Sequence, residues 1–153
     1  MIVYQGPGDL FQCGMQTIAC PINVVGAMGK GLAEQFKLKV PGLFEYYRTH
    51  YGNSQEGWQR RIHQLEMFTV RPDKRVLLFP TKGLWRQPAI LSAIEANLSQ
   101  VAENYDRVGI TSLGIPMLGC GFDTGQLNWE RDVEPLVHGI LGPIPLPVKV
   151  MFG

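Results

Sequence analysis

Short, strand-like apolar runs alternate with helical patterns along this 153-residue chain, and this alternation restricts the fold more than any other feature. Helices between consecutive strands can cover both faces of a sheet, so the pattern predicts a three-layer α/β domain with a largely parallel or mixed sheet. A chain of this length fits one domain, spanning residues 1–153. We expect strands at 2–5, 17–21, 62–70, 76–79, 108–113 and 148–152, and helices at 28–38, 42–51, 88–105 and 129–141.

Two glycine-rich stretches, at 23–33 and 114–125, each follow an expected strand and lead toward an expected helix. Glycine lets backbone N–H groups approach a phosphate without a Cβ clash, and a helix N-terminus adds electrostatic attraction. Ligands of such sheets lie beyond the carboxyl ends of the strands, where we expect both stretches and the Thr81–Lys82 turn. The sequence therefore predicts a site that grips a diphosphate. The glycine spacing matches neither a Walker loop nor G-x-G-x-x-G, which disfavours P-loop NTPases and Rossmann dehydrogenases.

Composition argues against several other classes of protein and of binding site. The net charge of +1 disfavours extended binding to duplex DNA as the main role, although a single nucleotide or a short single strand can still enter a pocket. Three cysteines without a C-x-x-C pair argue against a disulfide framework or a zinc site, and the three histidines lack metal-ligand spacing. We expect no metal and no cofactor. With no apolar run long enough for a bilayer and no basic signal region, we expect a cytoplasmic location without membrane contact.

Polar residues in and before the first glycine-rich stretch suit a nucleotide ligand, and each has a plainer structural alternative. The amide of Asn23 can donate and accept, which suits ribose hydroxyls, or it can form an Asx turn or a helix cap. Lys30 can contact a phosphate or be solvated. Asp9 can accept a hydrogen bond from an adenine amino group or cap a turn. The glycines that would present backbone amides to an anion are Gly26, Gly29 and Gly31.

Three further residues are candidates for chemistry. A lysine near an apolar wall, as Lys82 would be, loses hydration of its ammonium, which lowers its pKa and frees the amine as a nucleophile; most loop lysines have no such role. Asp123, beside an expected phosphate site, suits either general acid/base work or a turn. Cys120 is more readily an apolar filler than a nucleophile. Trp85 either packs in the core or walls the pocket.

Together these residues resemble the macrodomain family of ADP-ribose-binding modules over essentially the whole chain. The motifs that carry the resemblance are Gly-Asp-Leu at 8–10, the stretch 23–37, Phe-Pro-Thr-Lys-Gly-Leu-Trp-Arg at 79–86, Ile-Pro-Met-Leu-Gly-Cys-Gly at 115–121 and Leu-Asn-Trp at 127–129. Met-Gly-Lys-Gly-Leu-Ala at 28–33 and Pro-Thr-Lys-x-x-Trp-Arg are similar to the DNA ADP-ribosyl glycohydrolase antitoxins. The same branch holds the terminal ADP-ribose glycohydrolase of glutamate-modified proteins.

The resemblance implies a mixed six-stranded sheet between helices, with ADP-ribose across its crest. By carry-over, Asp9 and the Leu10 backbone hold adenine, the loop from Ile115 to Gly125 wraps the diphosphate, and the stretch from Asn23 to Gly31 embraces the distal ribose. Lys82 matches the catalytic lysine and Asp123 the acid/base residue of the protein-directed branch. The implied catalytic residues are Lys82, Asp123 and Asn23, and the implied ligand contacts are Asp9, Leu10, Asn23, Gly26, Met28, Gly29, Lys30, Gly31, Thr81, Pro116, Leu118, Gly119, Cys120, Gly121, Phe122 and Asp123.

The function that the resemblance implies is an ADP-ribosyl hydrolase acting on a modified macromolecule, with a lysine nucleophile. The alternatives are a module that binds ADP-ribose without cleaving it and a phosphatase of ADP-ribose 1″-phosphate. Asp123 stands where the antitoxins usually have glycine, which favours protein-directed enzymes, and Leu84 replaces a common histidine. Thymidine in DNA and glutamate in protein therefore both stay open as the modified group. A cognate ADP-ribosyltransferase toxin is the implied partner of an antitoxin.

Overall fold

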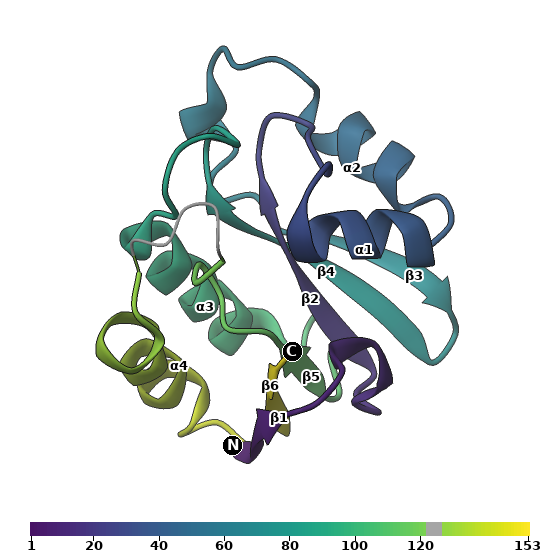
Figure 1. The fold of residues 1–153 in the computed structure, drawn as a ribbon. Coiled ribbons are helices and arrows are strands. Elements are labelled where there is room, and N and C mark those ends of the chain that lie inside the picture. Colours follow the sequence, from purple (N-terminus) through teal and green to yellow (C-terminus); the bar gives the residue numbers. More distant parts are fainter. Residues whose placement is uncertain (122–126) are drawn as a thin grey trace.

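A computed structural model describes residues 1–121 and 127–153, and in it six strands form one sheet in the order β1-β6-β5-β2-β4-β3 (Figure 1). The first five strands in this order are parallel to their neighbours, and β3 runs antiparallel to β4 at one edge. The expected mixed six-stranded sheet is confirmed. The bounds are Ile2–Pro7 for β1, Thr17–Asn23 for β2, Glu66–Arg71 for β3, Lys74–Lys82 for β4, Leu113–Ile115 for β5 and Val148–Phe152 for β6.

Helices cover both faces of this sheet, which gives the three expected layers (Figure 1). Helices α1 (Gly31–Lys39) and α2 (Leu43–Tyr51) pack on one face, and α3 (Leu91–Asn104) and α4 (Glu134–Leu141) pack on the other. A π-helical turn at Trp129–Val133 leads into α4, and short 3₁₀ turns occur at Leu10–Gln12 and Trp58–Arg60. In residues 1–121 and 127–153, no helix has the length and apolarity that a membrane crossing requires.

Strand β4 shows how the sequence supports two cores. Its side chains alternate, so Val76 and Leu78 join the cluster under α1 and α2, whereas Leu77 and Phe79 join the cluster under α3 and α4. All four side chains are buried. Because a strand between two helical layers is apolar on both faces, its sequence reads as an unbroken apolar run. The expectation of a buried interior strand is confirmed, since β4 lies between β2 and β3.

Two strands extend further than their apolar runs, and this matters for the site. The run at 17–21 continues to Asn23, and the run at 76–79 continues to Lys82. Both polar candidates are therefore the last residues of neighbouring parallel strands.

Three expected elements begin elsewhere. The helix expected from residue 28 begins at Gly31, because a turn held by Asn23 occupies the preceding residues. The helix expected from residue 88 begins at Leu91, because Ile90 is extended and its N–H donates to the Thr81 carbonyl oxygen at 2.8 Å. The strand expected at 62–70 is shifted to Glu66–Arg71.

The strand expected at 108–113 was wrong for most of its length. Strand β5 comprises only Leu113–Ile115. The Val108 N–H donates to the Asn104 carbonyl at 3.0 Å, and the Ile110 N–H donates to the Tyr105 carbonyl at 2.8 Å, with Gly109 between them at φ +80°. These bonds complete the C-terminal turn of α3, so β-branched residues that resemble a strand lie in a helix terminus.

Candidate active site

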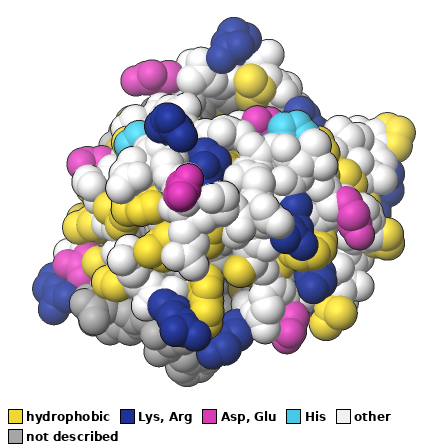
Figure 2. All heavy atoms as spheres, turned by 90° about the horizontal axis from the view of Figure 1, so that it is seen from above, with side chains coloured by type: hydrophobic (Ala, Val, Ile, Leu, Met, Phe, Trp, Pro, Cys, Tyr) yellow, Lys and Arg dark blue, Asp and Glu magenta, His cyan; other side chains and the backbone are white. Residues whose placement is uncertain are grey.

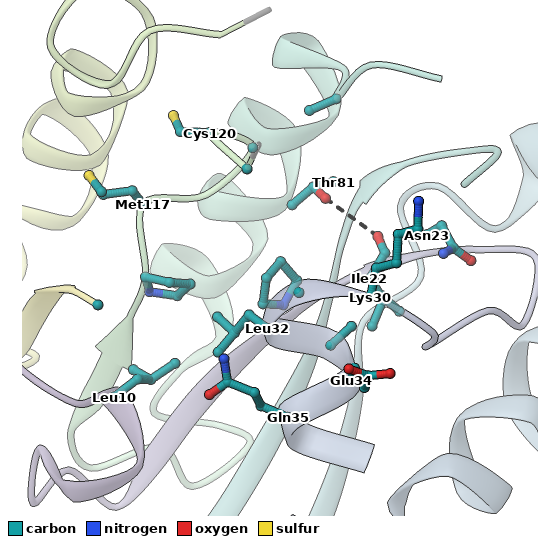
Figure 3. A pocket seen from close by; sticks show the side chains of 18 of the residues that line it. Leu10, Ile22, Asn23, Lys30, Leu32, Glu34, Gln35, Thr81, Met117 and Cys120 are labelled. Atoms are coloured by element: carbon teal, nitrogen blue, oxygen red, sulfur yellow. Dashed lines mark hydrogen bonds between the residues drawn. The ribbon is translucent and has the colours of Figure 1, made fainter. Parts of the chain in front are cut away.

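A cleft of about 1180 Å³ lies over the carboxyl ends of the parallel strands. This volume exceeds the usual range for drug-sized ligands, roughly 300–1,000 Å³, and suits an extended ligand. In Figure 3, Leu10 and Gln35 lie toward one end of the cleft, Asn23 and Lys30 toward the other, and Met117 and Cys120 on the opposite wall. The sequence-predicted residues that line it are Asp9, Leu10, Asn23, Gly29, Lys30, Gly31, Thr81, Lys82, Pro116, Gly119, Cys120 and Gly121.

Lys82 and Asn23 are brought together by strand register. Their Cα atoms are partners across the parallel strands β4 and β2, after an irregularity between Ile22 and Asn23. The half-buried Lys82 places its Nζ 3.1 Å from the carbonyl oxygen of Trp85, to which it donates a hydrogen bond. Lys82 and Asn23 therefore both line the cleft from the ends of neighbouring strands, and a primary amine in such a place suits nucleophilic attack on a bound electrophile.

The side chain of Asn23 organises the loop that follows β2. Its Oδ1 accepts hydrogen bonds from the N–H groups of Val25 at 3.1 Å and Ala27 at 3.3 Å, and its Nδ2 donates to the Ala27 carbonyl at 2.8 Å. Only 7% of Asn23 is exposed. The Asx-turn interpretation agrees with this geometry. A contact between Asn23 and a ribose stays a prediction.

Tyr47, on α2, holds the same loop, and the sequence analysis gave it no role in the site. Its buried hydroxyl accepts from the Gly26 N–H at 3.0 Å and lies 2.7 Å from both the Oδ1 and the carbonyl oxygen of Asn23. Burial raises the pKa of this hydroxyl far above its usual value, so it stays protonated and can donate. Pairing across 24 residues leaves no local signal in the sequence.

Removing the hydroxyl of Tyr47 should destabilise the fold more than removing the hydroxyl of its neighbour Tyr46. Tyr47→Phe removes the acceptor of the buried Gly26 N–H and the donor to the Asn23 oxygens, and we expect a loss of about 1–3 kcal/mol in the free energy of unfolding. Tyr46→Phe is the matched control, because its half-buried hydroxyl donates to the Met67 carbonyl at 2.8 Å where water can replace it. Urea unfolding of both variants measures the difference, and equal losses would contradict this role for Tyr47.

The N-terminus of α1 opens onto the cleft. Lys30, the N-cap residue, and Gly31, at φ +60°, both line it, and among the described residues no side-chain hydrogen bond caps the first turn. Uncapped N–H groups with the positive end of a helix dipole attract anions. The first glycine-rich stretch thus has the backbone geometry expected of a phosphate-binding element.

The loop after β5 forms the opposite wall. Gly119 has φ +73°, and a Cβ there would lie 2.7 Å from Cδ1 of Ile94, so this turn requires glycine. Burial raises the pKa of the Cys120 thiol, and the charges of Asp132 and Glu130 raise it further. A thiol that stays protonated at neutral pH is a poor nucleophile, which supports the apolar-filler interpretation of Cys120.

Several residues that the sequence predicted as ligand contacts do not line the cleft. Met28 and Leu118 are core residues, and the Gly26 N–H is bonded to Tyr47, so these three lie outside the lining of the cleft. Their contact with a ligand stays a prediction. Phe122 and Asp123 lie outside the described residues.

Asp9 has the structural role that sequence reasoning weighed against ligand binding. Its Oδ1 accepts from the Phe11 N–H at 2.9 Å and caps the first 3₁₀ turn. It also lines the cleft, so an adenine contact stays a prediction. Across residues 1–121 and 127–153 no group of His, Cys, Asp and Glu is arranged to hold a metal.

Sequence reasoning missed other lining residues, although one rule could have found some of them. Phe152 is the last residue of β6, a parallel strand like β2 and β4, and Gly153 follows it. Glu34 and Gln35 face the cleft from α1, one turn beyond Gly31. Trp85 lines the cleft, so its interpretation as a pocket wall is confirmed.

The chain is similar to proteins of one kind, although no family model matches it. It is 32% identical over 157 residues to a DNA ADP-ribosyl transferase–DNA ADP-ribosyl glycohydrolase fusion protein of Thermosipho africanus, and 35% identical over 145 residues to a DNA ADP-ribosyl glycohydrolase of Mycobacterium tuberculosis. These matches cover 94% and 95% of the chain, which spans 40% of each relative's length. The human ADP-ribose glycohydrolase OARD1 is 27% identical, over 94% of this chain and 86% of that protein.

Solved structures give the same picture. The macrodomain of Thermus aquaticus DarG matches with a TM-score of 0.86 and 25% identity, covering 100% of this chain and 99% of that one. The macrodomain of Mycobacterium tuberculosis DarG matches with a TM-score of 0.82 and 31% identity, covering 100% and 98%. Thermosipho africanus DarTG in complex with ADP-ribose matches with a TM-score of 0.82 and 30% identity, covering 95% and 40%.

Proposed function

We propose that this chain, which belongs to the macrodomain family, is an ADP-ribosyl hydrolase that removes ADP-ribose from a modified macromolecule. The observation that carries the proposal is the amine of Lys82, which lies in register with Asn23 at the base of a cleft large enough for an extended nucleotide. A module that only bound ADP-ribose would need no primary amine at this position. Relatives that are more than 30% identical are named as glycohydrolases, which supports the same choice.

The backbone supplies most of the binding. The uncapped first turn of α1 and the Pro116–Gly121 loop face each other across the cleft and hold the diphosphate, while Asp9 and Leu10 contact the adenine end. The turn at Asn23 contacts the distal ribose. Binding energy from the adenosine diphosphate part then orients the anomeric carbon toward Lys82, which lowers the entropic barrier to attack.

Lys82 acts as the nucleophile. Its neutral amine attacks the anomeric carbon of the distal ribose, and a C–N bond forms as the bond to the macromolecule breaks. The electron pair leaves with the released group, which takes up a proton, and the amine loses one. Water then attacks the same carbon, the C–N bond breaks, and its electron pair and a proton return to Nζ. One water is consumed per ADP-ribose released, and Asp123 is the proposed carrier of the protons.

A nucleobase in DNA is the first candidate for the modified group, with thymidine as the base that the antitoxin resemblance implies. Relatives at 32% and 35% identity are named as acting on DNA, whereas OARD1 is 27% identical. One relative is a fusion with a DNA ADP-ribosyl transferase. A transferase that modifies DNA is therefore the proposed partner, whose modification this chain reverses.

Side-by-side hydrolysis tests the proposal. The protein is incubated with a thymidine-ADP-ribosylated oligonucleotide, a glutamate-ADP-ribosylated protein and ADP-ribose 1″-phosphate, and the products are separated by chromatography. We expect free ADP-ribose from the oligonucleotide. Phosphate release from the third compound alone would favour a phosphatase, and no release from any substrate would reject the hydrolase.

A further inference from the structure

An exposed tryptophan lies at the rim of the cleft, one turn after Lys82. Trp85 lines the cleft and has 37% of its surface exposed. The Lys82 amine donates its hydrogen bond to the Trp85 backbone carbonyl, so the indole and the amine belong to the same short turn. The macromolecule is bonded to the sugar that Lys82 attacks, so it must extend out of the cleft near this rim. The residues of this rim therefore meet the macromolecule rather than the ADP-ribose.

Arg86 adds a cation to this aromatic surface. Its guanidinium carbon lies 4.4 Å from the centroid of the Trp85 ring, and both residues are exposed. Over the described part of the chain, neither of the salt bridges found involves Arg86 and no hydrogen bond engages its side chain. Trp85 as a whole is 37% exposed with the guanidinium in place, so part of this residue is open to a ligand.

The turn that carries both side chains is anchored at each end. The Gly83 carbonyl accepts from the Val24 N–H at 3.1 Å, and the Gln87 N–H donates to the Leu84 carbonyl at 3.1 Å. Gly83 packs closely against the ring of Trp58. A Cβ at position 83 would lie only 2.3 Å from the Cε3 atom of Trp58. A turn held in this way loses little conformational entropy when a ligand binds.

The charged residues next to Trp85, at this part of the rim, are basic. The acidic residues among the described lining, Asp9 and Glu34, come from the turn after β1 and from α1, whereas Lys82 is the last residue of β4 and Arg86 follows in the turn after it. Figure 2 looks down on the top of the Figure 1 view and shows Lys and Arg side chains interspersed with Asp and Glu ones among hydrophobic and uncharged surface, so this face as a whole carries charges of both signs. An aromatic face beside a guanidinium that forms no salt bridge with the described residues suits a base and its phosphate, whereas a glutamate-linked polypeptide offers neither group.

We propose that Trp85 and Arg86 form a subsite for single-stranded nucleic acid on the far side of the scissile bond. The indole stacks on a base at or next to the modified nucleotide, and the guanidinium binds a backbone phosphate. The subsite selects a nucleic-acid substrate over a protein one, and it rests on the hydrolase function proposed above.

Three variants test the subsite with the full chain. Trp85→Leu removes the aromatic face but keeps the backbone carbonyl that holds Lys82, and Trp85→Phe restores part of the face. Stacking is worth about 1–3 kcal/mol per base, so Trp85→Leu should lower the selectivity, measured as the ratio of kcat/KM on thymidine-modified oligonucleotide to that on glutamate-modified peptide, by about tenfold. Most of the loss should appear in KM on the oligonucleotide, and Trp85→Phe should recover part of it.

Arg86→Gln tests the phosphate contact through salt dependence. Each phosphate contact with a single strand contributes about 0.7 to the slope of log affinity against log salt, so the slope for KM on the oligonucleotide should shrink by about that amount. Arg71→Gln is the control, because this arginine pairs with Asp73 near the start of β4, at the opposite end of that strand from Lys82, and its loss changes the net charge equally.

The outcomes separate the subsite from the enzyme. If wild type releases ADP-ribose but Trp85→Leu lowers turnover equally on both substrates, or leaves the selectivity unchanged, the subsite is rejected and the hydrolase stands. An Arg86→Gln slope equal to that of wild type rejects the phosphate contact. Release from the peptide alone also overturns the subsite. No release from either substrate rejects the hydrolase, and the subsite with it.

Discussion

Lys82→Ala should reduce release of ADP-ribose by roughly a thousandfold or more, since loss of a nucleophile removes the pathway rather than one contact. Affinity for free ADP-ribose should change far less, because the diphosphate and adenine contacts come from other segments of the cleft. Single-turnover hydrolysis and calorimetry measure the two effects separately. Lys37→Ala is the matched control: Lys37 lies on α1 over the Phe44 ring and does not line the cleft.

Chemical trapping makes this prediction sharper. An amine bonded to the anomeric carbon exchanges with a ring-opened imine, which borohydride reduces to a stable amine. Wild type quenched with borohydride during turnover should carry one ADP-ribose unit on the peptide that contains Lys82, and Lys82→Ala should carry none. Turnover that survives in Lys82→Ala, or a label on another residue, would remove Lys82 from the mechanism.

Gly26→Ala should have the largest effect on the fold. Gly26 has φ +84°, and a Cβ there would lie 2.5 Å from the Gly52 carbonyl oxygen, which is backbone and cannot rotate away. A left-handed conformation costs a residue with a Cβ about 1–2 kcal/mol, and overpacking adds about 1–3 kcal/mol. We expect a loss of about 3 kcal/mol in the free energy of unfolding, together with weaker binding of ADP-ribose, because the same turn positions Asn23.

Gly29→Ala supplies the comparison within the same loop. A Cβ at Gly29 meets no heavy atom of residues 1–121 and 127–153 within 4 Å, and its φ is not positive. Urea unfolding should therefore show a change of at most about 1 kcal/mol for Gly29→Ala. A similar destabilisation by both variants would mean that the loop is not held by the contacts at Gly26.

Much of this site follows from simple rules applied to the sequence. Parallel strands present their carboxyl ends at one edge, so placing Asn23 and Lys82 after apolar runs was enough to predict that they lie at the same edge of the sheet. That β2 and β4 are neighbours, with these two residues in register, came from the structure. The spacing of the glycines likewise indicated which backbone segments face the cleft. Local pattern and topology sufficed because each of these residues acts where its own strand or helix terminates.

Other parts depend on contacts between distant segments. The support of the Asn23 turn by Tyr47 crosses 24 residues, and Tyr47 looks like an ordinary apolar helix residue in the sequence. The error at 108–113 has a different cause, because Val108 and Ile110 carry a strand-like pattern while their N–H groups bond back to α3. Backbone hydrogen bonding there overrides the β-propensity of the side chains.

Calorimetric titration of the wild-type protein with ADP-ribose tests the central claim most directly. The cleft should bind one ADP-ribose with saturable heat, and a ligand at one hundred times its Kd should stabilise the fold by about 2.7 kcal/mol, seen as a rise in Tm. Gly26→Ala should bind more weakly under the same conditions. Absence of both heat and thermal shift in the wild-type protein would contradict the account, since every proposed step begins with ADP-ribose in this cleft.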